Sequence, residues 1–232
     1  MNDKFAGLVL SISDYRENDV LMQVLSKEYG IISLIGKAAK KLNSRNHFLN
    51  FCLYEFIIDY NEGKTIFAVH GHKLLKDYFE SENLKRMTFK NILCELALKN
   101  RDIPLFDELH FVFDRLNDDN LYLLGSMYAA HLIRNFGITP IVDSCCLCDN
   151  KKVVSISNRH GGFVCEKHLN GEDILPVDTL KKFRLMIKGR FANYDVLKDF
   201  VFEARDFYLL MDFFLLNTVI RIRAYDFYKT MH

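Results

Sequence analysis

Four side chains that suit metal binding form two closely spaced pairs in the second half of the sequence. Cys145 and Cys148 make a C-x-x-C pair, and Cys165 and His168 make a C-x-x-H pair after sixteen intervening residues. Two tight turns that each offer two ligands are typical of four-coordinate zinc sites, and a hairpin between them would bring the pairs together. Because thiolates and imidazole suit zinc better than magnesium or calcium, the spacing predicts one zinc ion.

Four protein ligands leave no coordination position for water, so we expect a structural rather than a catalytic metal. A redox C-x-x-C pair is a weaker interpretation because no parallel α/β pattern surrounds it. Chance clustering of core thiols is also disfavoured, since polar, glycine-containing sequence surrounds both pairs. Cys146 is then surplus, although an exchange with Cys145 as ligand stays open, and His160 is a weaker substitute for His168.

Motifs that indicate catalysis are absent from the sequence: it has no G-x-x-x-x-G-K-[ST], G-x-G-x-x-G, H-E-x-x-H or G-x-S-x-G pattern. A metal-dependent hydrolase that uses His70, His72 and Glu17 is the remaining catalytic hypothesis. Histidines at alternate positions of a strand end and an acid in a turn are more often solvated polar residues. We therefore expect that the protein is not an enzyme.

Positive charge is concentrated in two segments although the formal net charge is only +1. No Asp or Glu occurs from Tyr29 to Tyr54, a stretch that carries Lys37, Lys40, Lys41 and Arg45. The second segment, "LKKFRLMIKGR", places Lys181, Arg184 and Lys188 on one face of an expected helix. Basic runs are often plain solvated faces, but the lack of interleaved acids favours contact with nucleic acid.

The elements that must position these residues change in character near residue 80. Five β-rich segments precede that point, at about residues 5–13, 18–26, 29–37, 51–60 and 64–72, and the polar stretch Asn61 to Gly63 predicts a hairpin between the last two. Because five short strands cover few residues, closing them into a small barrel of the OB type removes exposed edges.

Helical periodicity follows, at residues 84–99, 104–116, 120–137, about 178–189 with Asp178 or Thr179 as N-cap, and about 199–228. We therefore predict an α+β protein with two domains. Residues 1–80 form the OB-fold domain, and residues 81–232 form a helical domain with the zinc knuckle inserted at about 143–170.

The chain is expected to be cytoplasmic. Cys52 and Cys94 lie alone within apolar stretches, which is typical of buried thiols in a reducing compartment. The sequence contains no run of eighteen apolar residues and no secretory leader, so we expect neither a membrane span nor export.

The order of these features resembles the RecO family of bacterial DNA repair proteins. The likeness begins in "GLVLSISDYRENDVLMQVLSKEYG", with the turn at Tyr15 and Glu17 and a later turn at Ser26, Glu28 and Gly30. It continues in "GKAAKKLNSR", which is similar to the family's glycine-basic-serine loop, and ends in "CCLCDN" and "GGFVCEKHL". It covers nearly the whole chain, although the last sixty residues or so match only in helical character.

Two positions depart from the family pattern. Asp149 stands where the first knuckle usually has glycine, and His168 stands where many relatives have cysteine. Both changes are compatible with zinc, because Asp is able to adopt a left-handed turn conformation and imidazole is an ordinary fourth ligand.

The resemblance implies a mediator of recombination that binds single- and double-stranded DNA and anneals complementary strands. With RecR, and sometimes RecF, such proteins help RecA to replace the single-strand-binding protein SSB on DNA. The implied DNA contacts are Lys37, Lys40, Lys41 and Arg45, with Tyr15, Phe48 and Phe51 as candidate stacking rings that are more often core residues.

The helix face formed by Lys181, Arg184 and Lys188 is a second candidate surface, for DNA or for an acidic peptide such as the C-terminal tail of SSB. An alternative function is a zinc-stabilised RNA-binding module, because OB barrels bind RNA as readily as DNA.

Overall fold

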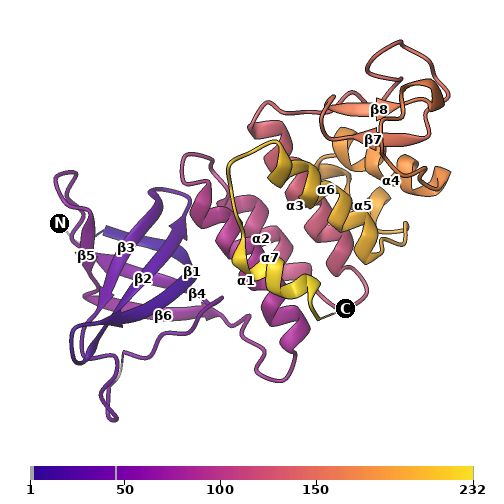
Figure 1. The fold of residues 1–232 in the computed structure, drawn as a ribbon. Coiled ribbons are helices and arrows are strands. Elements are labelled where there is room, and N and C mark those ends of the chain that lie inside the picture. The colour runs from indigo at the N-terminus through magenta and orange to yellow at the C-terminus, as the bar shows by residue number, and fades with distance from the viewer. Residues whose placement is uncertain (1–2, 45, 232) are drawn as a thin grey trace. The chain divides into compact units, whose positions relative to one another are not determined.

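The structure is a computed structural model that describes residues 3–44 and 46–231. The chain divides into two compact units, one of residues 1–115 with 222–232 and one of residues 116–221. The predicted boundary at residue 80 lies inside the first unit, between its sheet and its first helix, and as a division into functional domains it stays a prediction. Figure 1 shows the course of the chain.

The strands of the first unit form one curled sheet in the order β5-β3-β2-β1-β4-β6. Their bounds are β1 Asp3–Tyr15, β2 Asp19–Ser26, β3 Gly30–Gly36, β4 Leu53–Ile58, β5 Ile66–Ala68 and β6 Gly71–Lys76. β1 is long enough to pair with β4 through its first half and with β2 along most of its length, with a register shift between Val9 and Ser11. Gly7 sits in this strand because a Cβ there would lie 2.4 Å from Val24 Cγ1.

The two ends of the sheet are joined by one extended segment. β5 pairs with β3 in parallel, and β6 then pairs with β4 in antiparallel fashion. Between them, Val69 N–H donates to Ile35 O and His70 N–H donates to Ile57 O. Taken together β5 and β6 act as the fifth strand of an OB-like sheet, so the predicted fold is confirmed. The expected direct hairpin between residues 51–60 and 64–72 is wrong for β5, whose partner is β3.

Apolar side chains that alternate along the strands fill the inside of this sheet. Cys52 and Cys94 are both free and buried, as the sequence predicted. The described part of the first unit is completed by the helices α1 Leu84–Lys99, α2 Phe106–Arg115 and α7 Arg223–Lys229. α7 packs on α1, with the rings of Phe89 and Tyr228 5.7 Å apart, and the Glu95 carboxylate accepts hydrogen bonds from the first N–H groups of α7.

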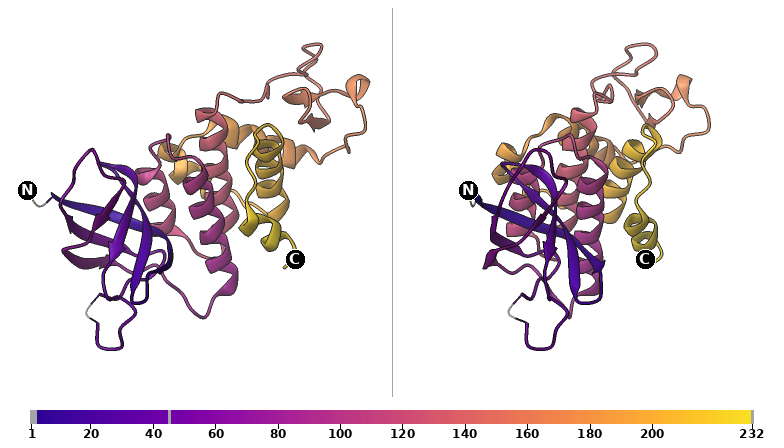
Figure 2. Two further views of the ribbon diagram at one scale, coloured as in Figure 1. Left: turned by 60° about the vertical axis from the view of Figure 1, so that its left-hand side comes forward. Right: turned by 90° about the vertical axis from the view of Figure 1, so that its left-hand side faces the viewer.

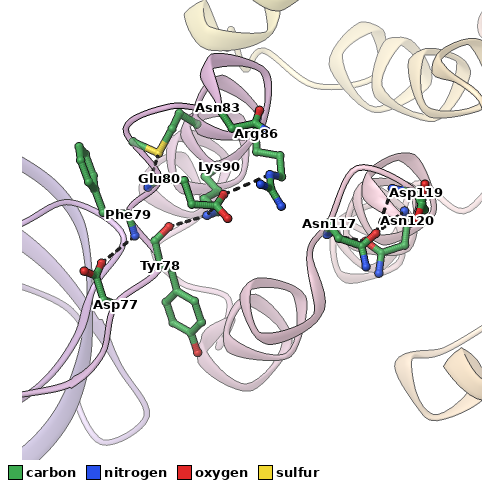
Figure 3. Close-up of polar contacts among 11 residues, drawn as sticks. Asp77, Tyr78, Phe79, Glu80, Asn83, Arg86, Lys90, Asn117, Asp119 and Asn120 are labelled. Carbon is green, nitrogen blue, oxygen red and sulfur yellow. Dashed lines mark hydrogen bonds and ion pairs between the residues drawn. The ribbon is translucent and has the colours of Figure 1, made fainter.

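The segment between β6 and α1 is held by a buried lysine. Lys90, on α1, donates to the Tyr78 carbonyl oxygen and to Glu80 Oε2, the latter at 2.9 Å (Figure 3). Glu80 also lies 3.3 Å from Arg86 Nε, and the Asn83 side chain caps the first turn of α1. The connection is therefore fixed to the first turns of the helix that follows it.

The second unit packs α3 Leu121–Asn135 against α4 Val177–Lys188 and α6 Ala204–Leu216. It also contains the hairpin β7 Ser155–Ser157 and β8 Gly162–Val164, and the short helices η1 Glu166–His168, η2 Phe191–Asn193 and α5 Tyr194–Leu197. The N-cap of α4 is Pro176 rather than Asp178 or Thr179, so that prediction is wrong by two or three residues.

The single helix expected over residues 199–228 is two helices, α6 and α7. The break follows from the residues at the end of α6: Asn217 Nδ2 donates to Phe213 O at 2.8 Å, and Thr218 Oγ1 donates to Phe214 O at 2.9 Å. Side chains that bond to the preceding turn compete with helix continuation, and the chain then crosses to the first unit.

Candidate metal centre and nucleic-acid interface

The four predicted metal ligands lie together. The ligand atoms of Cys145, Cys148, Cys165 and His168 are all within 4.8 Å of one another. Cys148 Sγ is 3.6 Å from Cys165 Sγ, and His168 Nδ1 is 3.4 Å from Cys145 Sγ and from Cys165 Sγ. A tetrahedron with metal–sulfur bonds of about 2.3 Å has edges of about 3.8 Å, so the cluster could hold a metal ion.

Local backbone geometry builds each ligand pair. In the first turn Cys145 N–H donates to Asn150 O, Asp149 N–H donates to Cys145 O, and Asp149 has a left-handed φ of 57°. The left-handed conformation expected for Asp149 is thus confirmed. In the second turn His168 N–H donates to Cys165 O at 2.9 Å, and the β7–β8 hairpin joins the two turns.

The surroundings of Cys145 favour its thiolate. Burial raises the pKa of the Cys145 thiol, but donation from the N–H groups of Leu147 and Cys165, together with the contact to His168, outweighs burial and lowers that pKa to about 6. Cys146 is half-buried and packs beside the cluster without belonging to the ligand set. His160 instead lies 3.1 Å from Ser157 Oγ.

The basic loop, of which the structure describes residues 37–44 and 46, leaves the end of β3 and extends away from the sheet (Figure 2). Lys37 and Lys41 are exposed and have no acidic partner among the described residues, whereas Lys40 Nζ lies 2.9 Å from Asp14. Arg45 lies outside the described residues. The loop is folded on itself, because Asn46 Nδ2 donates to Lys37 O at 2.8 Å.

Two of the three candidate stacking rings pack against other aromatic rings inside the first unit. Phe51 is buried and lies beside Phe113, and Phe48 packs on Phe56 in the sheet core. Tyr15 is half-buried at the β1–β2 turn. The sequence could not separate these rings, because a small barrel needs aromatic residues inside.

The predicted face on α4 is partly neutralised. Phe183, Met186 and Ile187 are buried as expected, and Lys181 is exposed. Asp143, however, pairs with Arg184 at 2.5 Å and with Lys188 at 2.6 Å. Asp143 lies some forty residues upstream, so the local sequence gave no sign of this pairing.

Sequence reasoning missed Arg134 beside that face. A hollow of about 780 Å³ lies between Arg134, Ile141, Lys188 and Arg190. Arg134 Nη1 donates to the carbonyl oxygens of Met186 and Ile187, and burial, followed by the charge of Arg190, lowers its pKa to about 10. Neither Arg134 nor Arg190 has a carboxylate partner in the part of the chain that the structure describes, and no sequence signal pointed to Arg134.

The two histidines of the hydrolase hypothesis have separate partners. His70 Nε2 pairs with Asp59 at 3.2 Å, while His72 packs against Phe48 with centroids 4.5 Å apart. Within residues 3–44 and 46–231, the metal-capable side chains that cluster are the three cysteines and His168. None of the described helices is long and apolar enough to span a membrane.

Two family models match the chain, one in its N-terminal part and one in the part that follows. The family described as Recombination protein O N terminal matches residues 1–78, and Recombination protein O C terminal matches residues 81–196. The chain belongs to the RecO family. Members of the RecO family are generally non-enzymatic recombination mediators.

Curated relatives named DNA repair protein RecO match this chain over most of their own length. The DNA repair protein RecO of Clostridium perfringens is 30% identical over 177 residues, or 69% of this chain and 70% of the relative. Those of Bacillus cytotoxicus and Listeria welshimeri are 25% and 24% identical over 84% and 89% of this chain, and over 85% and 88% of their own lengths.

Proposed function

We propose that this RecO-family chain is a DNA repair and recombination mediator that binds single- and double-stranded DNA and anneals complementary strands. With RecR, and in some settings RecF, it would help RecA to replace SSB on single-stranded DNA. Its place of action would be the cytoplasm, at the nucleoid during repair. Family membership over most of the chain and the OB-like sheet support this proposal.

The observation that carries the DNA-binding part is the basic loop. Lys37 and Lys41 project from an OB-like sheet, and both are exposed and without a carboxylate partner among the described residues. Unpaired cations next to a sheet of this type are suited to the phosphates of a nucleic acid. Lys40 would exchange Asp14 for a phosphate, and Arg45 of the same loop is proposed as a fourth contact.

Zinc is the proposed occupant of the metal cluster. Three sulfur ligands and one imidazole are a common set for structural zinc, and all four tetrahedral positions are taken by protein. The ion would hold the two turns and the β7–β8 hairpin together. No step of DNA binding is assigned to it.

The C-terminal tail of SSB is the proposed partner of α4. An acidic peptide that ends in a carboxylate needs cations without acidic partners, and Arg134 and Arg190 supply these beside Lys188. Ile141 is half-exposed in the same hollow and offers an apolar contact. A smaller hollow next to Lys181, Arg184 and Lys188 continues this surface.

The function is tested by annealing of complementary strands coated with SSB. We expect the protein to accelerate annealing with intact SSB, and to lose much of that acceleration with SSB lacking its acidic tail. Acceleration that is equal for both forms would remove the proposed tail site. A protein that binds RNA in preference to DNA of the same length would remove the proposed function.

The basic loop is tested by reversing Lys37, Lys40 and Lys41 to Glu. Affinity for DNA should fall for all sequences alike, and the salt slope on single strands should shrink by about 0.7 for each lost phosphate contact. Reversal of Lys64, Lys73 and Lys99, which are exposed elsewhere in the first unit, makes the same change in net charge. Equal loss in both variants would mean that net charge, and not the basic loop, determines binding.

A further inference from the structure

The turn between β1 and β2 is fastened to the basic loop. Lys40 N–H donates to Asn18 O at 3.0 Å, and Ala38 N–H donates to Asp19 Oδ1 at 2.8 Å. The Lys40 side chain also reaches Asp14, at 2.9 Å. Two loops that are separate in the sequence therefore form one surface at this end of the sheet.

Arg16 stands at the tip of that turn in a costly conformation. Its φ is 55°, in the left-handed region that long side chains rarely adopt and that glycine occupies easily. The side chain is exposed, so no packing requirement accounts for an arginine at this position. Strain kept at a residue that glycine would relieve is a common sign of function.

The guanidinium of Arg16 is oriented and available. Arg16 Cζ lies 5.2 Å from the centre of the Tyr15 ring, which places the cation over a flat aromatic surface. Among the described residues no carboxylate lies within ion-pair distance of Arg16. Asp14 is engaged by Lys40, and Asp19 accepts the Ala38 N–H, so the neighbouring acids are directed into the loop. Glu17 is the remaining acid of the turn, and it is exposed.

We propose that Arg16 is a further phosphate contact of the nucleic-acid site, held by Tyr15 and placed beside Lys37 and Lys41 by the fastened turn. This inference rests on the proposed DNA-binding function and adds a residue to it. The arginine fork matches a phosphate in two hydrogen bonds, which a lysine in the basic loop does not. The site thus combines the lysine ammonium groups of the basic loop with the oriented guanidinium group of Arg16 in the β1–β2 turn.

Ala38 provides a matched control because it has the same φ of 55° in the partner loop and carries no charge. Replacing either residue by glycine relieves the left-handed strain, but only R16G removes a cation. Replacing Arg16 by lysine keeps the charge and removes the fork. Comparison of the three variants separates backbone strain, charge and fork geometry.

The experiment measures the affinity of a labelled single-stranded oligonucleotide across a series of salt concentrations, together with the thermal midpoint of each variant. R16G should bind about three- to tenfold more weakly, with the salt slope reduced by about 0.7, while its midpoint stays at or above that of the unchanged protein. A38G should have a thermal midpoint similar to that of R16G, and its affinity for the oligonucleotide should lie within about twofold of that of the unchanged protein. R16K should restore the slope and only part of the affinity.

Unchanged affinity and slope in R16G would overturn the proposal, and so would a weaker affinity that is accompanied by a lower thermal midpoint. Equal loss of affinity in A38G and R16G would also overturn it, since the backbone would then be responsible. These outcomes are distinct from failure of the proposed function, in which the unchanged protein itself would not bind DNA.

Discussion

At the scale of single residues, the residue type shows which chemistry is possible, and the geometry shows which residue is in position to perform it. The sequence left Cys145 and Cys146 as alternatives, whereas the structure places Cys145 in the cluster and Cys146 beside it. The same holds for Arg16 and Ala38, whose left-handed backbone no composition reveals. A side chain's chemistry is local, but its availability depends on where the backbone points it.

Removing one ligand should remove the metal. Cys165→Ser is expected to reduce bound zinc from about one equivalent per chain to nearly none and to lower the thermal midpoint, because a structural site contributes its binding free energy to folding. Cys146→Ser, one position from a ligand, should keep both the metal and the midpoint. Metal content by mass spectrometry and a thermal melt decide this; metal-free protein that stays fully folded would contradict it.

At the scale of elements, the connection between β6 and α1 depends on an ion pair whose lysine is buried and whose glutamate side chain is 32% exposed. Lys90 is buried, and its cation is satisfied by the Tyr78 carbonyl and by Glu80. A buried cation that keeps only one acceptor costs far more than an exposed pair contributes. This buried side chain on α1 thus helps to orient the connection.

Replacing Glu80 by Gln should lower the free energy of unfolding by about 1–3 kcal/mol, since the buried Lys90 would lose its carboxylate partner. The double variant Glu80→Gln with Lys90→Met should recover most of that loss, because the cation itself is gone. Urea unfolding of the single and double variants measures the coupling. Additive losses would show that the pair does not act as a unit.

At the scale of the whole molecule, the chain returns to its first unit at the end. Residues 116–221 form the second unit, and α7 then packs on α1. Ile222, Tyr225 and Tyr228 are buried there. The last helix therefore belongs to the fold of the first unit in spite of its distance in the sequence.

Tyr228→Ala should lower the free energy of unfolding of the first unit by about 3–5 kcal/mol, as expected for loss of a fully buried aromatic ring. Its neighbour Phe227 is 54% exposed, and Phe227→Ala should change stability by less than about 1 kcal/mol. Zinc content should be unaffected in both variants, because the cluster lies in the other unit. Denaturant unfolding compares them, and similar effects from both residues would contradict the assigned packing.

The sequence by itself determined what depends on neighbours along the chain. Alternation of apolar residues predicted the strands, a period near 3.6 predicted the helices, and the spacing of two ligand pairs predicted the cluster of Cys145, Cys148, Cys165 and His168. A run without acids likewise marked the basic loop. In each case the signal lies in residues that are close to one another in the sequence.

Only the tertiary structure decided which partners distant residues find. It closed the sheet by pairing β5 with β3, and it split the last predicted helix so that α7 reaches α1. It paired Asp143 with the basic residues of the α4 face. At the other surface it paired Asp14 with Lys40, whereas Lys37, Lys41 and Arg16 have no carboxylate partner among the described residues. Ion pairs act over a few ångströms in space, and the sequence gives no distance between residues that only folding brings together.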